Sequence, residues 1–372
     1  MRSERPWNRT RGGNHDGRSC GGLGRDEGIK RAVKKILWIA IPAAIITGLI
    51  LLVQQRQGGG ATHEAQQELM GTIVKIKAHG KELSRGRFDE VSRSAFAEIA
   101  RLEKEMSEWI PESPISQAAR FAGQKAVPIS EEIVAVIDLS LAVSRQTGGA
   151  FDISFKPLGL LWRVEKRKEP PREEEIRAAL RLVDYRDIVL DKGRRTLFLK
   201  HPGMAVGLGA IAKGYAAGRA ARKMAEGGIR DFIIDAGGDL YFSGSKGGKA
   251  WTCGIQDPDR KGEQLIRLKV KTDCAVVTSG DYERYFDFQG RRYHHIIDTR
   301  TGYPATGSRS VTVLARDPAV ADAYATSFFI LGPVKAAEIA GRNPGVAFIL
   351  IDDRGKVWRG GPIDEFVEEM TS

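Results

Sequence analysis

The chain has 372 residues, which is enough for one large domain or two ordinary domains with a full hydrophobic core. Its net charge of +11 is uneven, because residues 1–35 hold ten Arg or Lys against four acids and the rest carries only +5. That rest contains no stripe of arginines interleaved with aromatic residues, so the sequence argues against nucleic-acid binding.

Residues 36–53 contain no charge and, at about 1.5 Å per residue, are just long enough to cross a bilayer core as a helix. The cations before this run and the single Arg56 close behind it leave the N-terminus in the cytoplasm by the positive-inside rule. A cleaved signal peptide is disfavoured, because the basic region is long and no Ala-x-Ala follows. A lipoprotein is disfavoured because Cys20 precedes the run. We expect an uncleaved single-pass anchor in the inner membrane.

Three further segments flank this predicted anchor. We expect a disordered basic cytoplasmic tail at residues 1–35, a linker at 54–66 and an extracytoplasmic, periplasmic domain at 67–372. Within that domain, apolar periodicity and breaker residues predict strands at 69–78 and 231–235 and a hairpin at 187–200. Helices are predicted at 91–109, after Ser130 up to Gly148, at 173–183 and at 211–224. Residues 241–314 are mostly strands and turns, and two short helices and a last strand at 346–352 close an α+β fold.

Asp322 and Thr326 lie four residues apart in an apolar run, so on a helix they point the same way, one turn apart. A carboxylate and a hydroxyl in that setting suit Mg²⁺, which takes oxygen ligands and often shares them with a phosphate substrate. The alternative is that Asp322 caps the helix that follows.

A Gly-rich turn at residues 207–214 opens a predicted helix and contains Lys213. Such a turn presents backbone N–H groups and the positive helix end to an anion, although a plain strand–helix turn explains it equally well. Residues 235–239 and 278–282 form further polar turns after apolar strands. His294 and His295 are adjacent on a predicted strand, and a zinc site there is disfavoured because no third ligand has suitable spacing. Cys253 and Cys274 either pair or remain two semi-buried thiols.

Seven short sequence motifs occur in the order seen in the FAD:protein FMN transferases of the ApbE family. The chain resembles this family from about residue 69 to 352. The motifs are Met-Gly-Thr at 70–72, Ala-Phe-Asp at 150–152, the turn at 207–214, Asp-Ala-Gly-Gly-Asp at 235–239, Ser-Gly-Asp-Tyr at 279–282, His-Ile-Ile-Asp at 295–298 with Thr-Gly at 301–302, and the run from 321 to 326. Seven ordered motifs are far more specific than any one of them.

The resemblance implies an ApbE-like fold of mixed sheets with flanking helices. It also implies an Mg²⁺-dependent enzyme that cleaves FAD, places FMN on a Thr or Ser hydroxyl of an acceptor protein and releases AMP. The acceptor would be a membrane-associated redox protein. By motif position, the metal ligands would be Asp322, Thr326 and the carbonyl of Ala210. The FAD site would be lined by Met70, Trp109, Ala150, Phe151, Asp152, Gly207, Lys213 and Ile297.

Two groups are available to accept the proton of the attacking hydroxyl, His295 and Asp281, and the sequence does not rank them. The family commonly has Asp where this chain has Gly207, so the resemblance implies weaker FAD binding here and tighter binding in a Gly207→Asp variant. The alternatives are an FAD pyrophosphatase that gives FMN and AMP, and a membrane-anchored flavin-binding protein without turnover.

Overall fold

The computed structural model describes residues 60–271 and 273–371. The predicted tail and membrane anchor therefore lie outside the described residues. Among the described residues, no helix combines the length and apolarity needed to span a membrane. The linker predicted at 54–66 is wrong for residues 61–66, which belong to β1 (Ala61–Leu69). That strand is largely exposed and polar, so it lacks an apolar alternation, and its antiparallel pairing with β2 (Thr72–Gly80) fixes it instead.

The core of the fold is an eight-stranded sheet in which every neighbouring pair is antiparallel. Its strand order is β1-β2-β6-β7-β10-β13-β14-β15. The six strands that follow β2 in this order are β6 (Phe232–Ala236), β7 (Asp239–Ser243), β10 (Cys274–Gly280), β13 (Ser308–Ala315), β14 (Val346–Asp352) and β15 (Val357–Gly360). The expected α+β class is confirmed, and the order of the strands places chain segments far apart in sequence side by side.

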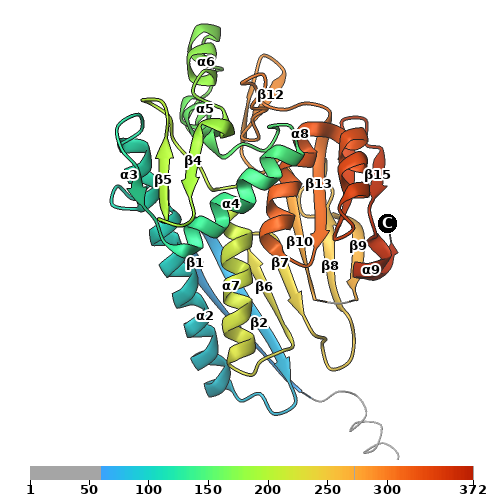
Figure 1. Ribbon diagram of the computed structural model, residues 1–372. Helices are drawn as coiled ribbons and strands as arrows, with labels where there is room; N and C mark the ends of the chain where they lie inside the picture. Colours follow the sequence, from blue (N-terminus) through green and yellow to red (C-terminus); the bar gives the residue numbers. More distant parts are fainter. Residues whose placement is uncertain (1–59, 272, 372) are drawn as a thin grey trace, which may run out of the picture. The chain divides into compact units, whose positions relative to one another are not determined.

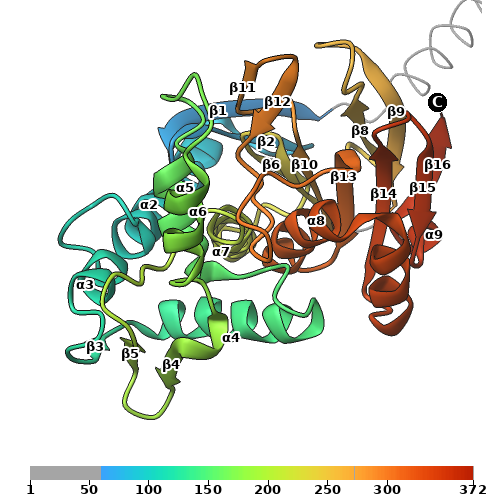
Figure 2. The ribbon, with the colours of Figure 1, turned by 90° about the horizontal axis from the view of Figure 1, so that it is seen from above.

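Helices cover one face of this sheet, as Figures 1 and 2 show. The inner helices are α2 (Arg85–Met106), α7 (Ala212–Glu226) and α8 (Pro318–Arg342), and α4 (Glu131–Gln146) lies on the outer side of α7 and α8. Alternate residues of β10 face opposite ways: Val277 joins the core under the helices, whereas Val276 joins a second core on the other face. That second core is completed by β8 (Trp251–Gln256), β9 (Gln264–Val270), α9 (Ile363–Phe366) and β16 (Val367–Thr371).

The remaining elements are short and lie at the periphery. They are α3 (Pro114–Arg120), β3 (Val127–Pro128), η1 (Ile153–Phe155), α5 (Lys156–Trp162), α6 (Glu173–Leu180), η2 (Tyr185–Asp187), β4 (Ile188–Asp191), β5 (Thr196–Leu199), β11 (Tyr285–Phe288) and β12 (Arg291–His294). The predicted hairpin at 187–200 and the predicted helices are confirmed, with Ser130 capping α4 by accepting the Ile133 N–H.

The C-terminal prediction of two helices is confirmed, and the prediction of a last strand needs a correction. The helix α8 consists of two helical segments that meet at a kink at Gly332, where φ is 74° and Pro333 follows. The strand at 346–352 is not the last, because β15, α9 and β16 follow it. In β15, exposed residues alternate with half-buried ones and none is fully buried. Its sequence therefore has little apolar pattern from which a strand could be predicted.

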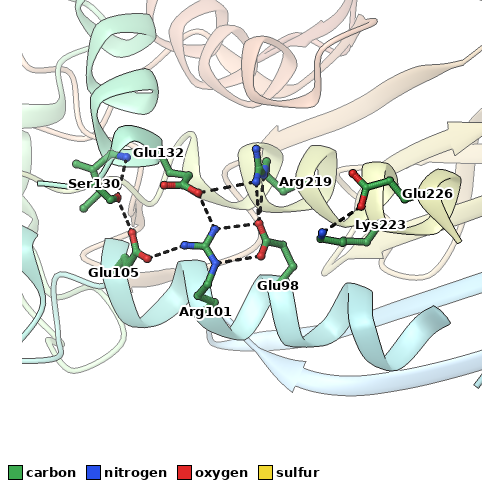
Figure 3. Close-up of polar contacts among 9 residues, drawn as sticks. Glu98, Arg101, Glu105, Ser130, Glu132, Arg219, Lys223 and Glu226 are labelled. Atoms are coloured by element: carbon green, nitrogen blue, oxygen red, sulfur yellow. Dashed lines mark hydrogen bonds and ion pairs between the residues drawn. The ribbon is translucent and has the colours of Figure 1, made fainter. Parts of the chain in front are cut away.

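Three helices of the inner and outer layers are joined by a network of ion pairs (Figure 3). The guanidinium of Arg101 contacts Glu98 at 2.9 Å, Glu105 at 2.6 Å and Glu132 of α4 at 2.8 Å. Arg219 of α7 adds a second cation, 3.2 Å from Glu98. The hydrogen bond from Arg101 lowers the pKa of Glu98 below its usual value. Each carboxylate of this cluster, which we call the helix network, therefore has a cationic partner.

Candidate active site

The N-terminus of α7 meets the first turns of α8 in a close backbone contact at Gly214. A Cβ at Gly214 would lie 2.1 Å from the carbonyl oxygen of Pro318, so only glycine permits this approach. The contact brings the Gly214 N–H within 3.0 Å of Oδ2 of Asp322. The Gly-rich turn thus directs the positive end of α7 at a carboxylate.

Asp322 is buried, with 4% of its surface exposed. It is not the cap of its own helix, because Asp317 accepts the Ala319 N–H at the start of α8. The Gly214 N–H is the one hydrogen-bond donor to the Asp322 carboxylate among the described residues. Burial raises the pKa of this carboxyl, and the cation of Lys213 opposes that rise. The carboxylate is therefore only partly compensated by its protein surroundings.

Thr326 and Lys213 lie close to this carboxylate. The hydroxyl of Thr326 is half-buried, 3.4 Å from the hydroxyl of Ser279 on β10. Lys213 forms an ion pair with Asp239, at the start of β7, so the turn at 235–239 joins the same corner. No group of three or more His, Cys, Asp or Glu side chains suited to a metal occurs in the described part of the chain. The predicted ligand set contains only one such side chain, with a hydroxyl and the Ala210 carbonyl, and its oxygen chemistry fits Mg²⁺.

The two adjacent histidines have different roles. His294 is buried, its Nε2 lies 2.9 Å from the carbonyl of Ala305, and its Nδ1 accepts the Ile296 N–H. Burial lowers its pKa to about 4, so the imidazole is neutral, and both of its ring nitrogens have partners within the protein. His295 is partly buried and places Nδ1 3.3 Å from the carbonyl of Arg284. A carbonyl only accepts, so Nδ1 carries the proton and Nε2 is left as an acceptor.

Burial also lowers the pKa of His295, to about 3, with smaller contributions from the nearby cations of Arg284 and Lys213. The cation of Lys213 thus influences the pKa of both His295 and Asp322. The turn that follows His295 borders an open hollow of about 490 Å³, lined in part by Asp298 and Thr301.

Asp281, the other predicted base, is held by two arginines. Its Oδ2 accepts a hydrogen bond from Arg309 at 2.9 Å, and Arg292 approaches Oδ1 at 3.7 Å. Burial raises the pKa of this carboxyl and the two cations oppose that effect. The contact with Arg309 joins the end of β10 to β13, whereas Oδ1 of Asp281 is buried without a hydrogen-bond partner among the described residues.

Among the predicted FAD residues outside the loop at 207–214, Met70 and Trp109 are the less enclosed ones. Met70 has φ of 53° in the two-residue turn between β1 and β2, which is rare for a residue other than glycine. The carboxylate of Glu103 holds this turn by accepting the Met70 N–H at 2.7 Å. Trp109 is 66% exposed, with the Lys156 ammonium 3.2 Å from its ring centroid.

The other predicted FAD residues are more enclosed. Ala150 and Phe151 are buried in the core under the helices, and Ile297 is buried in a cluster with Trp162. The carboxylate of Asp152 accepts hydrogen bonds from Ser154 and from the Tyr185 N–H, and burial raises its pKa to about 6.

Three side chains near the site were missed from the sequence: Glu103, Glu108 and Lys156. Single acids and lysines near a helix end carry no periodic or motif signal, and only the fold shows what they contact. Cys253 and Cys274 are free thiols in the second core, where burial raises the pKa of each to about 12. The disulfide considered for them is not formed.

Comparison with known proteins gives a consistent result. The model of the ApbE family matches residues 70–350. An FAD:protein FMN transferase of Klebsiella pneumoniae is 33% identical over 269 residues, covering 72% of this chain and 82% of that relative. One of Treponema pallidum is 30% identical over 310 residues, covering 78% and 85%. The crystal structure of the ApbE protein from Thermotoga maritima superposes with a TM-score of 0.75 at 29% identity and covers 83% of this chain and 100% of that one.

Proposed function

The chain belongs to the ApbE family and is an FAD:protein FMN transferase, and from this premise we propose that it requires Mg²⁺, places FMN on a Thr or Ser hydroxyl and releases AMP. The observation that carries the proposal is the buried, partly compensated carboxylate of Asp322 at the N-terminus of α7, next to Lys213. Such a carboxylate suits a divalent cation, which together with Lys213 would balance the negative charge that accumulates when a pyrophosphate is cleaved.

The proposed reaction is a displacement at the FMN-side phosphorus of FAD. The hydroxyl oxygen of the acceptor forms a new P–O bond, and the bond from that phosphorus to the bridging oxygen breaks. The bridging oxygen leaves with AMP and the electron pair, and the hydroxyl proton passes to a base. Lys213 is positioned to balance negative charge on the phosphates.

His295 is the better-placed base of the two that the sequence suggested. Its Nδ1–H is used by the Arg284 carbonyl, so Nε2 is available to accept the proton. Its lowered pKa keeps the imidazole neutral at physiological pH and at the same time weakens it as a base, so the available Nε2 is what favours His295. Asp281, in contrast, has both carboxylate oxygens near arginines.

Asp322, Thr326 and the Ala210 carbonyl would hold Mg²⁺. When bound, the ion supplies a Lewis acid that draws charge from the phosphate oxygens. The protein's own contribution is to fix the Asp322 oxygens through Gly214 and to keep Thr326 on the same face of α8.

The experiment that tests the proposal uses purified protein, FAD, Mg²⁺ and a candidate acceptor, followed by denaturing gel fluorescence and measurement of AMP. Flavin fluorescence on the acceptor together with AMP in equal amount supports the proposal. Free AMP and FMN without labelling would indicate FAD pyrophosphatase activity. Bound, unchanged FAD would indicate a flavin-binding protein without turnover.

We propose further that residues 36–53 anchor the enzyme in the inner membrane with the domain outside, acting on a membrane-associated redox protein. The charge asymmetry around the apolar run supports this orientation. Alkaline phosphatase fused after residue 60 should be active, and an N-terminal tag should remain on the mature protein. Loss of the tag near the linker would indicate a cleaved signal peptide instead.

A further inference from the structure

Gly207 lies in the loop before α7, where the resemblance led us to expect a missing carboxylate. Its φ is outside the left-handed region, so backbone conformation does not require glycine. A Cβ at this position would, however, lie 2.9 Å from Oε2 of Glu108 and 2.9 Å from the ring of Phe155. The space in which a side chain of residue 207 would begin is therefore already filled by a carboxylate from elsewhere in the chain.

Two contacts fix Glu108 in this place. Its Oε2 accepts the Leu208 N–H at 3.0 Å, and its Oε1 accepts a hydrogen bond from the Lys156 ammonium at 2.5 Å. The side chain of Lys156 is only 6% exposed, and that of Glu108 is 15% exposed. A buried lysine needs an anionic partner, so Lys156 and Glu108 hold each other beside the loop.

The same pair lies next to an open, aromatic surface. The Lys156 ammonium stacks on the Trp109 ring, whose side chain is 66% exposed. A Cβ at Gly209, two residues along the loop, would meet nothing within 4 Å, so the loop is open there. The cluster is thus buried on the protein side and accessible on the other.

The chemistry of a carboxylate limits what Glu108 binds. An ionised carboxylate has about four acceptor positions and no donor, and two positions are used by Leu208 and Lys156. The remaining positions suit an O–H or N–H group and repel a phosphate. Trp109 beside them offers an apolar face for a ring.

We infer that Glu108, held by Lys156, supplies the carboxylate of the loop at residues 207–214 and binds a hydroxyl or N–H donor of the flavin nucleotide. This inference rests on the proposed function, because it takes the flavin nucleotide as the ligand. It follows that Gly207 does not weaken FAD binding, and that Gly207→Asp does not strengthen it, since a second carboxylate would be forced against Glu108.

The test is a swap of the carboxylate between the two positions, read by calorimetric titration of FAD. Glu108→Ala and Gly207→Asp should each bind FAD about tenfold or more weakly, because a charged hydrogen bond is lost or two carboxylates are crowded together. The double variant Gly207→Asp/Glu108→Ala should bind within about twofold of the parent, because one carboxylate is present again. Parent-like binding by Glu108→Ala, tighter binding by Gly207→Asp, or additive losses in the double variant would overturn the inference.

A control separates the carboxylate from the lysine that it neutralises. Glu108→Ala/Lys156→Met removes both buried charges, so a loss of FAD affinity that persists in this variant belongs to the carboxylate. Recovery of parent affinity in it would overturn the inference. Thermal unfolding without FAD establishes that each variant is folded. If the parent binds FAD with this pattern and fails to label any acceptor, the proposed function fails while the binding role of Glu108 stands.

Discussion

Two clusters of charged residues contact α7, and they differ in how completely their carboxylates are compensated by neighbouring donors. In the helix network, Glu98 has hydrogen bonds from Arg101 and Arg219, and its pKa is lowered. At the N-terminus of the same helix, Asp322 accepts one backbone N–H among the described residues, and its pKa is raised. The first arrangement is complete without a ligand and joins helices. The second leaves charge that a cation can balance, as the proposed function requires.

The largest expected effect comes from removing the partly compensated carboxylate. Asp322→Ala should lower the rate of FMN transfer more than about a hundredfold, because it removes the only carboxylate among the proposed ligands of the metal. Folding should be little changed. The rate is measured by gel fluorescence over a range of Mg²⁺ concentrations, and urea unfolding serves as the control. Transfer at the parent rate in limiting Mg²⁺ would show that the metal assignment is wrong.

The second prediction concerns pH and has opposite signs in the two regions. Glu98 has a folded-state pKa below its ordinary 4.5, so its stabilising contribution is present above that pH and is lost as the pH falls through the folded-state pKa. Asp322 has a raised pKa, so its contribution is present below the ordinary 3.8 and is lost as the pH rises through the folded-state value.

Urea unfolding of the chelated protein checks these signs. As the pH rises from acid to neutral, Asp322→Asn should gain stability relative to the parent, whereas Glu98→Gln should lose it. If the free energy of unfolding of the two variants, relative to the parent, changed with pH in the same direction and by the same amount, the distinction between the two regions would be wrong.

The third prediction is that Arg101→Met lowers the stability of the protein and leaves the rate of FMN transfer unchanged. The variant leaves the acids of the helix network with fewer cations, and because the Arg101 side chain is 40% exposed, the expected cost is about 1–2 kcal/mol in the free energy of unfolding. FMN transfer by the folded variant should remain at the parent rate. A marked fall in transfer at a temperature where the variant is folded would mean that the network also sets the geometry of the site.

Thr326→Val should have the smallest effect. It removes a neutral oxygen, with its contact to Ser279, and leaves the carboxylate in place. We expect the Mg²⁺ concentration for half-maximal transfer to rise, by less than in a variant of Asp322, because a neutral ligand contributes less than a charged one. An unchanged Mg²⁺ dependence would exclude the hydroxyl from the metal site.

The sequence was most informative where chemistry lies within one segment. The Asp322–Thr326 spacing and the turn at 207–214 could be identified because their residues are close in sequence. Three kinds of feature could not be predicted. The strand β1 has no apolar alternation, the partner of Asp322 is a backbone N–H on another helix, and Glu108 lies 100 residues from the Leu208 N–H that it accepts. Each depends on tertiary contacts that leave no local pattern.

The contact between α7 and α8 at Gly214 also has a consequence for folding. The hydrogen bond from Gly214 to Asp322 joins residues 108 positions apart, so making it closes a long loop at a large entropic cost. We expect this contact to form after the strands between the two residues have paired, because that pairing shortens the loop that the contact must close. A ligand that binds at this corner stabilises the completed fold alone, and it therefore distinguishes finished molecules from partly folded ones.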